Sequence, residues 1–186
     1  MRAPVSFISL FWIVFLLYWA ISAIGTKKYA RRGAWGIFVR PAVALAIVLA
    51  LLLGPIRVSL LNEQLVHLSS AVQWLGVGLC GCGMVFAIWA RVHLGSNWGM
   101  PMSLKQDAEL VTSGPYAHVR HPIYTGFIVA MIGTTLVQIL WIVPLVLFFI
   151  YFLWSAKTEE KIMLNEFGEK YADYMRRTKM LIPLVL

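Results

Sequence analysis

Ionisable and aromatic polar residues gather in one stretch of this largely apolar sequence, residues 114–126. The stretch reads Gly-Pro-Tyr-Ala-His-Val-Arg-His-Pro-Ile-Tyr-Thr-Gly and leads directly into an apolar run. Charged groups at the edge of hydrocarbon are costly, so this placement indicates a functional site. The side chains that could do chemistry there are Tyr116, His118, Arg120, His121 and Tyr124.

These residue types are suited to binding an anion. Pro122 fits the first turn of a helix, where its missing N–H costs nothing. A helix that begins after His121 turns its free N–H groups and positive dipole end towards the Arg120 side, which favours a carboxylate or phosphate. Arg120 adds a bidentate donor, His118 and His121 add further donors, and the tyrosines add ring faces and hydroxyls.

Two adjacent acids, Glu159 and Glu160, follow the last apolar run. They can accept hydrogen bonds from an ammonium or a ribose, so a ligand with both an anion and a cation would be held from two sides. The alternative is that all these residues only anchor helix ends at the membrane interface. A metal site is not expected, because no second pair of ligands accompanies His118 and His121.

Composition points to an integral membrane protein. The 186 residues are 60% hydrophobic and only 13% charged, where soluble domains are about a quarter charged. The net charge of +8 does not indicate nucleic-acid binding, because the basic residues form short clusters between apolar spans. Membrane lipids are the expected surroundings, and the oligomeric state is left open.

The apolar pattern predicts an all-α fold with five transmembrane helices. A charged amphipathic helix is expected at residues 157–179, where apolar side chains recur at helical spacing. We expect a single domain over residues 1–186, with three spans in residues 1–93 and a cofactor-binding core in residues 94–186. The expected spans are residues 5–24, 41–61, 71–92 and two within 123–156, separated by a break near residues 138–141.

Charge distribution predicts the orientation. With five spans, every Lys and Arg except Arg2 and Arg57 lies on the face that holds the 114–126 stretch. The positive-inside rule makes that face cytoplasmic, with the carboxyl terminus, and leaves the amino terminus outside.

The motifs together resemble the isoprenylcysteine carboxyl methyltransferase family, whose core the phospholipid N-methyltransferases share. The resemblance covers residues 94–183, and the Arg-His-Pro-x-Tyr-x-Gly piece alone is less specific because membrane sterol reductases carry a similar one. The residues that carry it are Gly114-Pro115-Tyr116, Arg120 to Gly126, Glu159-Glu160, Phe167-Gly168, Tyr171, Tyr174 and Pro183.

The resemblance implies S-adenosylmethionine as methyl donor and S-adenosylhomocysteine as product. Its carboxylate is expected near Arg120 and His121, its ammonium or ribose at Glu159 or Glu160, and its sulfonium against Tyr116 or Tyr124. The full predicted cofactor-binding set is Tyr116, His118, Arg120, His121, Tyr124, Glu159, Glu160 and Tyr171.

The resemblance also implies a lipophilic acceptor, an isoprenylcysteine-type carboxylate or a related lipid, that enters sideways from the bilayer. Arg120 or Arg91 would orient a carboxylate acceptor, whereas an amine or thiol would need a base such as Glu160 or His118. The predicted catalytic residues are Arg120, Glu160 and Arg91. Two alternatives stay open: a sterol-reductase-like enzyme that uses NADPH, and a non-catalytic membrane scaffold.

Overall fold

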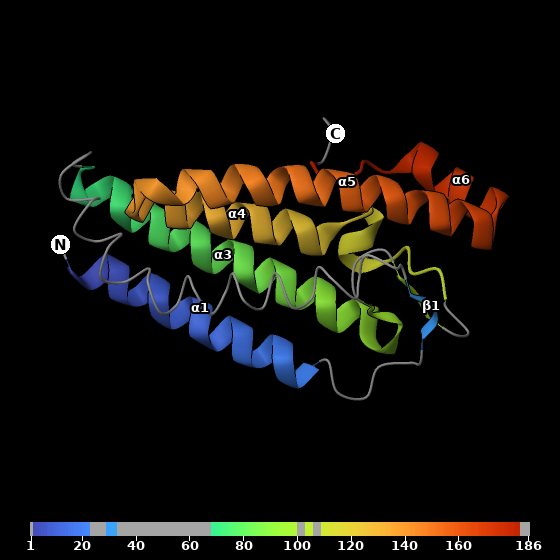
Figure 1. Cartoon of the computed structure of the whole chain (residues 1–186), viewed down its shortest axis with the longest axis horizontal. Helices are drawn as coiled ribbons and strands as arrows, with labels where there is room; N and C mark the ends of the chain where they lie inside the picture. The colour runs from blue at the N-terminus through green and yellow to red at the C-terminus, as the bar shows by residue number, and fades with distance from the viewer. Residues whose placement is uncertain (1, 23–28, 33–67, 100–102, 106–108, 183–186) are drawn as a thin grey trace.

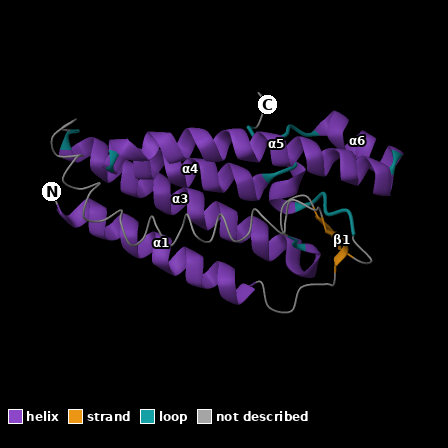
Figure 2. Cartoon of the chain, viewed as in Figure 1, coloured by secondary structure: helices purple, strands orange, loops and turns teal. Residues whose placement is uncertain are grey.

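The computed structural model describes residues 2–22, 29–32, 68–99, 103–105 and 109–182, and helices dominate it (Figures 1 and 2). The long helices lie lengthwise beside one another, and β1 and α6 lie at one end. The helices are α1 Arg2–Ser22, α3 Ser70–Leu94, α4 Pro122–Val137, α5 Ile142–Phe167 and α6 Glu169–Arg177. Single 3-10 turns are η1 Gly95–Asn97, η2 Gly114–Ala117 and η3 Ile139–Trp141, and the strands are β1 Tyr29–Arg32 and β2 Ser103–Lys105.

Three described helical segments are long and apolar enough to cross a membrane: Ala3–Ser22, Ser70–Asn97 and Ile139–Phe167. The shorter apolar helix Pro122–Val137 packs with them. Large apolar side chains remain exposed along α1, α3 and α5, as lipid-facing surfaces require. The all-α integral membrane fold is therefore confirmed. The predicted second span, 41–61, lies outside the described residues, so the count of five stays a prediction.

Glycines let α3 and α4 approach closely. A Cβ atom added to Gly83 would lie 2.6 Å from the carbonyl oxygen of Gly126, and one added to Gly133 would lie 2.5 Å from that of Gly76. The two glycines on each helix are seven residues apart, and because the helices are antiparallel, Gly83 faces Gly126 while Gly76 faces Gly133. Small residues at these positions bring the two backbones together, which suits packing in lipid, where apolar burial supplies no driving force between helices.

The expected break between the last two spans is confirmed. Helix α4 ends at Val137 and η3 leads into α5. Gln138 marks the corner: its backbone leaves the helical conformation, and its buried side-chain oxygen accepts a 2.9 Å bond from the Trp141 indole. An extended residue with its own local partner ends the helix without a glycine or proline.

The carboxyl-terminal helix starts later than predicted. We expected it from Lys157, but α5 continues as one 26-residue helix to Phe167. No proline or glycine interrupts Lys157–Phe167, and its residues are good helix formers, so nothing stops the helix before Gly168. Gly168, at φ 53°, ends it in the left-handed region that favours glycine. The amphipathic helix is therefore α6. Glu159 and Glu160 belong to α5, the helix that also forms the last apolar span.

A short antiparallel ladder joins two loops at the end of the bundle near α6 (Figure 2). Strand β1 pairs with β2, with Tyr29 opposite Lys105 and Arg32 opposite Ser103. Helices α1 and α3 run in the same direction towards this end, and α4 starts there (Figure 1). The ladder thus brings β1, which follows α1, beside β2, which follows α3. Both strands lie at the end of the bundle where α4 starts.

Candidate active site

The loop before α4 is clamped between α3 and α6. Tyr116 in η2 is buried; its hydroxyl donates to the Ala90 carbonyl at 3.4 Å, and its own carbonyl accepts a 2.6 Å bond from the Tyr174 hydroxyl. Gly114 adopts φ 59°, and a Cβ there would run into the His93 ring at 2.7 Å. The positive φ therefore favours glycine, and a larger residue would also have to displace the exposed His93 ring. These contacts fix the direction from which the chain enters α4.

Two cations and two acids meet where this loop joins α4. Arg120 Nε lies 2.5 Å from Glu160 Oε1. The His121 ring bridges both acids, with Nδ1 3.5 Å from Glu159 Oε2 and Nε2 3.6 Å from Glu160 Oε1. The Arg120 and Glu160 side chains are each only 9% exposed. The predicted meeting of the basic loop before α4 with the paired acids of α5 is confirmed, and we call these four residues the ion-pair cluster.

Tyr124 extends the ion-pair cluster into the bundle. Its hydroxyl donates to Glu159 Oε1, and Ser155 donates to the same oxygen at 3.1 Å. Its ring stacks on His121, with centroids 5.4 Å apart, and on Phe152 at 4.6 Å. The Tyr124 ring is thus packed against two neighbouring rings, and its hydroxyl orients Glu159.

Tyr171 is also brought beside the ion-pair cluster. It is buried on α6, with its ring 5.8 Å from that of Tyr174. Burial raises the pKa of its phenol, and the nearby Glu160 carboxylate raises it further. Tyr171 therefore keeps its proton and can only offer a neutral hydroxyl to a ligand.

Arg91 and His118 lie apart from the ion-pair cluster. Arg91 is buried at the end of α3, where it donates to the carbonyls of Gly95, at 2.9 Å, and Ser22. Its guanidinium carbon is 4.5 Å from the centre of the Trp98 ring. Arg91 thus holds the carboxyl-terminal ends of α1 and α3 together. His118 is exposed, and its ring makes none of the bonds described above.

The structure adds partners that sequence reasoning missed. Arg120 Nη1 donates to the backbone carbonyls of Thr178 and, at 3.3 Å, Met175. Backbone acceptors leave no mark in residue types, so no signal could have found them. Ser155 is different, because it lies one helical turn before Glu159, where a side chain can reach it.

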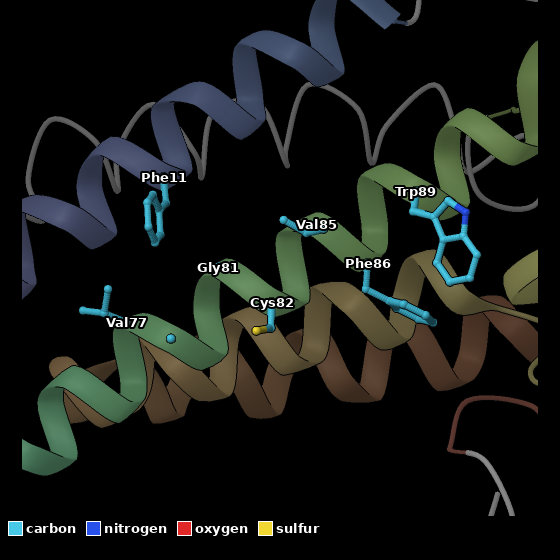
Figure 3. Close-up of a pocket in the computed structure, with 8 residues that line it drawn as sticks. Phe11, Val77, Gly81, Cys82, Val85, Phe86 and Trp89 are labelled. Carbon is cyan, nitrogen blue, oxygen red and sulfur yellow. The ribbon is translucent and has the colours of Figure 1, made fainter.

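The described residues offer two further observations on ligands. No group of three or more His, Cys, Asp or Glu side chains among them is placed to hold a metal ion. An open groove of about 610 Å³ lies between α1 and α3 (Figure 3). Its lining is apolar and includes no member of the ion-pair cluster, so a charged cofactor would not bind there. The lining residues are Phe11, Val77, Gly78, Gly81, Cys82, Val85, Phe86 and Trp89.

Comparison with known proteins identifies the relationship. The model of the isoprenylcysteine carboxyl methyltransferase (ICMT) family matches residues 76–165, which include the whole ion-pair cluster. The chain is similar to this family over these residues. A solved structure of the eukaryotic intramembrane Ras methyltransferase ICMT superposes with a TM-score of 0.61 at 27% identity, covering 78% of this chain and 53% of that one.

Curated relatives show the same relationship and some breadth of chemistry. The protein-S-isoprenylcysteine O-methyltransferase of Tribolium castaneum is 34% identical over 125 residues, 61% of this chain and 43% of the relative. A methanethiol S-methyltransferase of Pseudomonas deceptionensis is 38% identical over 77 residues, 41% of this chain and 29% of the relative. The chain therefore spans about half the length, or less, of these relatives.

Charge balance in the ion-pair cluster depends on His121. Burial alone would lower the pKa of the imidazole, but hydrogen bonding and proximity to Glu159 and Glu160 outweigh burial and raise it above 6.5. Protonated His121 and Arg120 then face two carboxylates, which makes the ion-pair cluster neutral overall. Loss of the imidazole proton would leave one acid without a matching cation.

The raised pKa predicts a pH-dependent stability. Protonation of His121 favours the folded state, so its contribution is fully present below the unfolded pKa of about 6.5 and is lost as pH rises through the higher folded value. Melting of purified protein in detergent between pH 6 and 9 tests this. The advantage of the wild type over His121→Gln should shrink by about 4 °C across the range. Parallel curves for the two proteins would contradict the assignment.

Proposed function

We propose that this chain is an S-adenosylmethionine-dependent methyltransferase that acts at the cytoplasmic membrane face on a lipophilic acceptor. The observation that carries the proposal is the ion-pair cluster, which joins the loop before α4 to the acids of α5. A zwitterionic nucleoside needs both signs of charge within one small site. The family match to residues 76–165 supports the same reading.

Unsatisfied polar atoms support a fit to the methyl donor. In the described part of the chain, the buried side-chain nitrogens without a hydrogen-bond partner are Arg91 Nε and His121 Nε2. Buried polar groups are nearly always paired, so such atoms indicate a missing ligand or water. His121 belongs to the predicted cofactor-binding set and lies in the ion-pair cluster, whereas Arg91 belongs to the predicted catalytic set and lies apart from that cluster. Arg120 uses Nε and Nη1 for the contacts described above, and Nη2 is the nitrogen that would bind an anion.

Each polar group of the cofactor has a proposed partner among these residues. Arg120 and His121 would take the carboxylate, and Glu159 or Glu160 would take the ammonium or the ribose hydroxyls. Tyr116 and Tyr171 would border the site as buried neutral side chains. When bound, S-adenosylmethionine supplies an electrophilic methyl group on a sulfonium and leaves as S-adenosylhomocysteine.

The chain's own residues contribute positioning and exclusion of water. Methyl transfer is an in-line displacement, which needs alignment of the two partners more than acid–base help. Arg120 and Glu160 are held by each other in a buried setting, so their geometry is fixed before a ligand arrives. For a carboxylate acceptor no base is required, and Arg91 is the second arginine that could orient it. For an amine or thiol, Glu160 or His118 would accept the proton.

The acceptor is proposed to be lipophilic, of the isoprenylcysteine carboxylate type or a related lipid. Exposed apolar faces on α1, α3 and α5 put the site within reach of the bilayer. The relatives differ in the acceptor that their names give: one is named for an isoprenylcysteine and another for methanethiol. We assign residues 94–186 to the donor and residues 1–93 to the acceptor, with the site and carboxyl terminus cytoplasmic and the amino terminus outside.

Two measurements test the proposal. Calorimetric titration of purified protein with S-adenosylhomocysteine should show binding, and radiolabelled donor should transfer methyl to at least one member of a panel of prenyl-cysteines, membrane lipids and lipophilic thiols. Binding of NADPH without binding of S-adenosylhomocysteine would instead support a reductase. Binding of neither would support a scaffold and overturn the proposal.

A further inference from the structure

The segment after α6 lies across the start of α4 as a strap, which we define as residues 178–181. The backbone N–H of Arg120 donates to the Lys179 carbonyl at 2.8 Å, and that of His121 donates to the Met180 carbonyl at 3.1 Å. Val119 and Lys179 form a parallel β-bridge. The two site residues next to α4 are thus held through their backbones by a segment that follows them by nearly sixty residues.

Leu181 anchors the strap. Its side chain is fully buried, at 0% exposure, in an apolar cluster with Tyr124, Phe152 and Ala156. Its carbonyl accepts a 2.6 Å hydrogen bond from the Thr125 hydroxyl. The next residue, Ile182, is 45% exposed. Leu181 is therefore the fully buried side chain that anchors the strap, packed against the ring that orients Glu159, and Met180 packs against the same cluster at partial exposure.

The strap also directs the Arg120 guanidinium. Nη1 donates to the carbonyls of Met175 and Thr178 at the end of α6, while Nε donates to Glu160. Carbonyls at a helix carboxyl terminus carry partial negative charge and suit a cation. These contacts hold the guanidinium through Nε and Nη1.

We propose that Leu181 is a positioning residue for the anion-binding end of the donor site. Burial of its side chain seats the strap, and the strap fixes the backbone and guanidinium of Arg120 and the backbone of His121. An arginine free to sample other rotamers must be ordered when the ligand binds, which weakens binding. The effect on donor binding rests on the proposed function; the effect on the loop does not.

The experiment compares Leu181→Ala with its exposed neighbour variant Ile182→Ala. Hydrogen exchange should show faster exchange of the Arg120 and His121 amides in Leu181→Ala only. Calorimetry should show S-adenosylhomocysteine binding weakened about tenfold, with the number of sites per chain unchanged. A merely structural defect would lower the number of sites and leave Kd as it is. Leu181→Met, which keeps volume and apolarity, should restore both readouts.

A second variant guards against misfolding of the first. Thr125→Val removes the hydroxyl bonded to the Leu181 carbonyl and keeps the apolar packing, so the same two changes should appear at smaller size. Unchanged exchange at Arg120 and His121, or faster exchange with an unchanged Kd, overturns the positioning role. Absence of ligand binding by the wild type would overturn the proposed function instead, while the exchange data would still decide whether Leu181 seats the strap.

Discussion

Replacing Glu160 with glutamine should weaken S-adenosylhomocysteine binding about tenfold to a hundredfold. Glu160 Oε1 lies 2.5 Å from Arg120 Nε and 3.6 Å from His121 Nε2. The neutral amide leaves two buried cations facing one acid, and breaking a buried pair is costly because the partner loses its compensation. Titration calorimetry of the purified variant checks the expectation.

A matched control variant separates loss of the binding site from loss of one negative charge. Glu166 lies on the same helix, α5, but is exposed. Glu166→Gln removes the same charge and should leave the affinity within about twofold, because exposed charges contribute little. Equal losses in the two variants would show that the ion-pair cluster is not the binding site. Arg120→Lys should resemble Glu160→Gln, since lysine cannot make the planar, forked set of bonds that Arg120 makes.

The position of the site was predictable because it depends on residue types. Pro122 marks the start of α4, and the apolar pattern placed the paired acids after the last span. Membrane crossings have nearly fixed length, so counting spans put Arg120 and Glu160 at the same end of the bundle. That reasoning needs only hydropathy and charge, which a single sequence contains.

The details that fix the site were not predictable for a related reason. The strap, the β1–β2 ladder and the Arg120 bonds to Met175 and Thr178 all use backbone groups, which every residue type carries. The extension of α5 past Lys157 also escaped prediction. The charged, helix-forming segment from Lys157 was predicted to be a separate amphipathic helix, but it continues α5 up to Gly168.

The second large effect is expected from one methyl group. Gly83→Ala on α3 should lower the melting temperature by more than about 6 °C, because overpacking at a backbone contact costs roughly 2–3 kcal/mol. The added Cβ would lie 2.6 Å from the Gly126 carbonyl oxygen, and the nearest atoms belong to backbone, which cannot rotate away. Helix α4 would have to move, and Arg120 and His121, which directly precede it, would move with it. Thermal melting in detergent measures the loss.

Gly78→Ala is the matched control on the same helix. No described atom lies within 4 Å of a Cβ at Gly78, and alanine is the better helix former by about 1 kcal/mol. This variant should therefore be neutral or slightly more stable than the wild type. Gly133→Ala, which meets the Gly76 carbonyl at 2.5 Å from the opposite helix, should repeat the loss seen at Gly83. Equal melting temperatures for Gly83→Ala and Gly78→Ala would mean that α3 and α4 are not held at backbone contact.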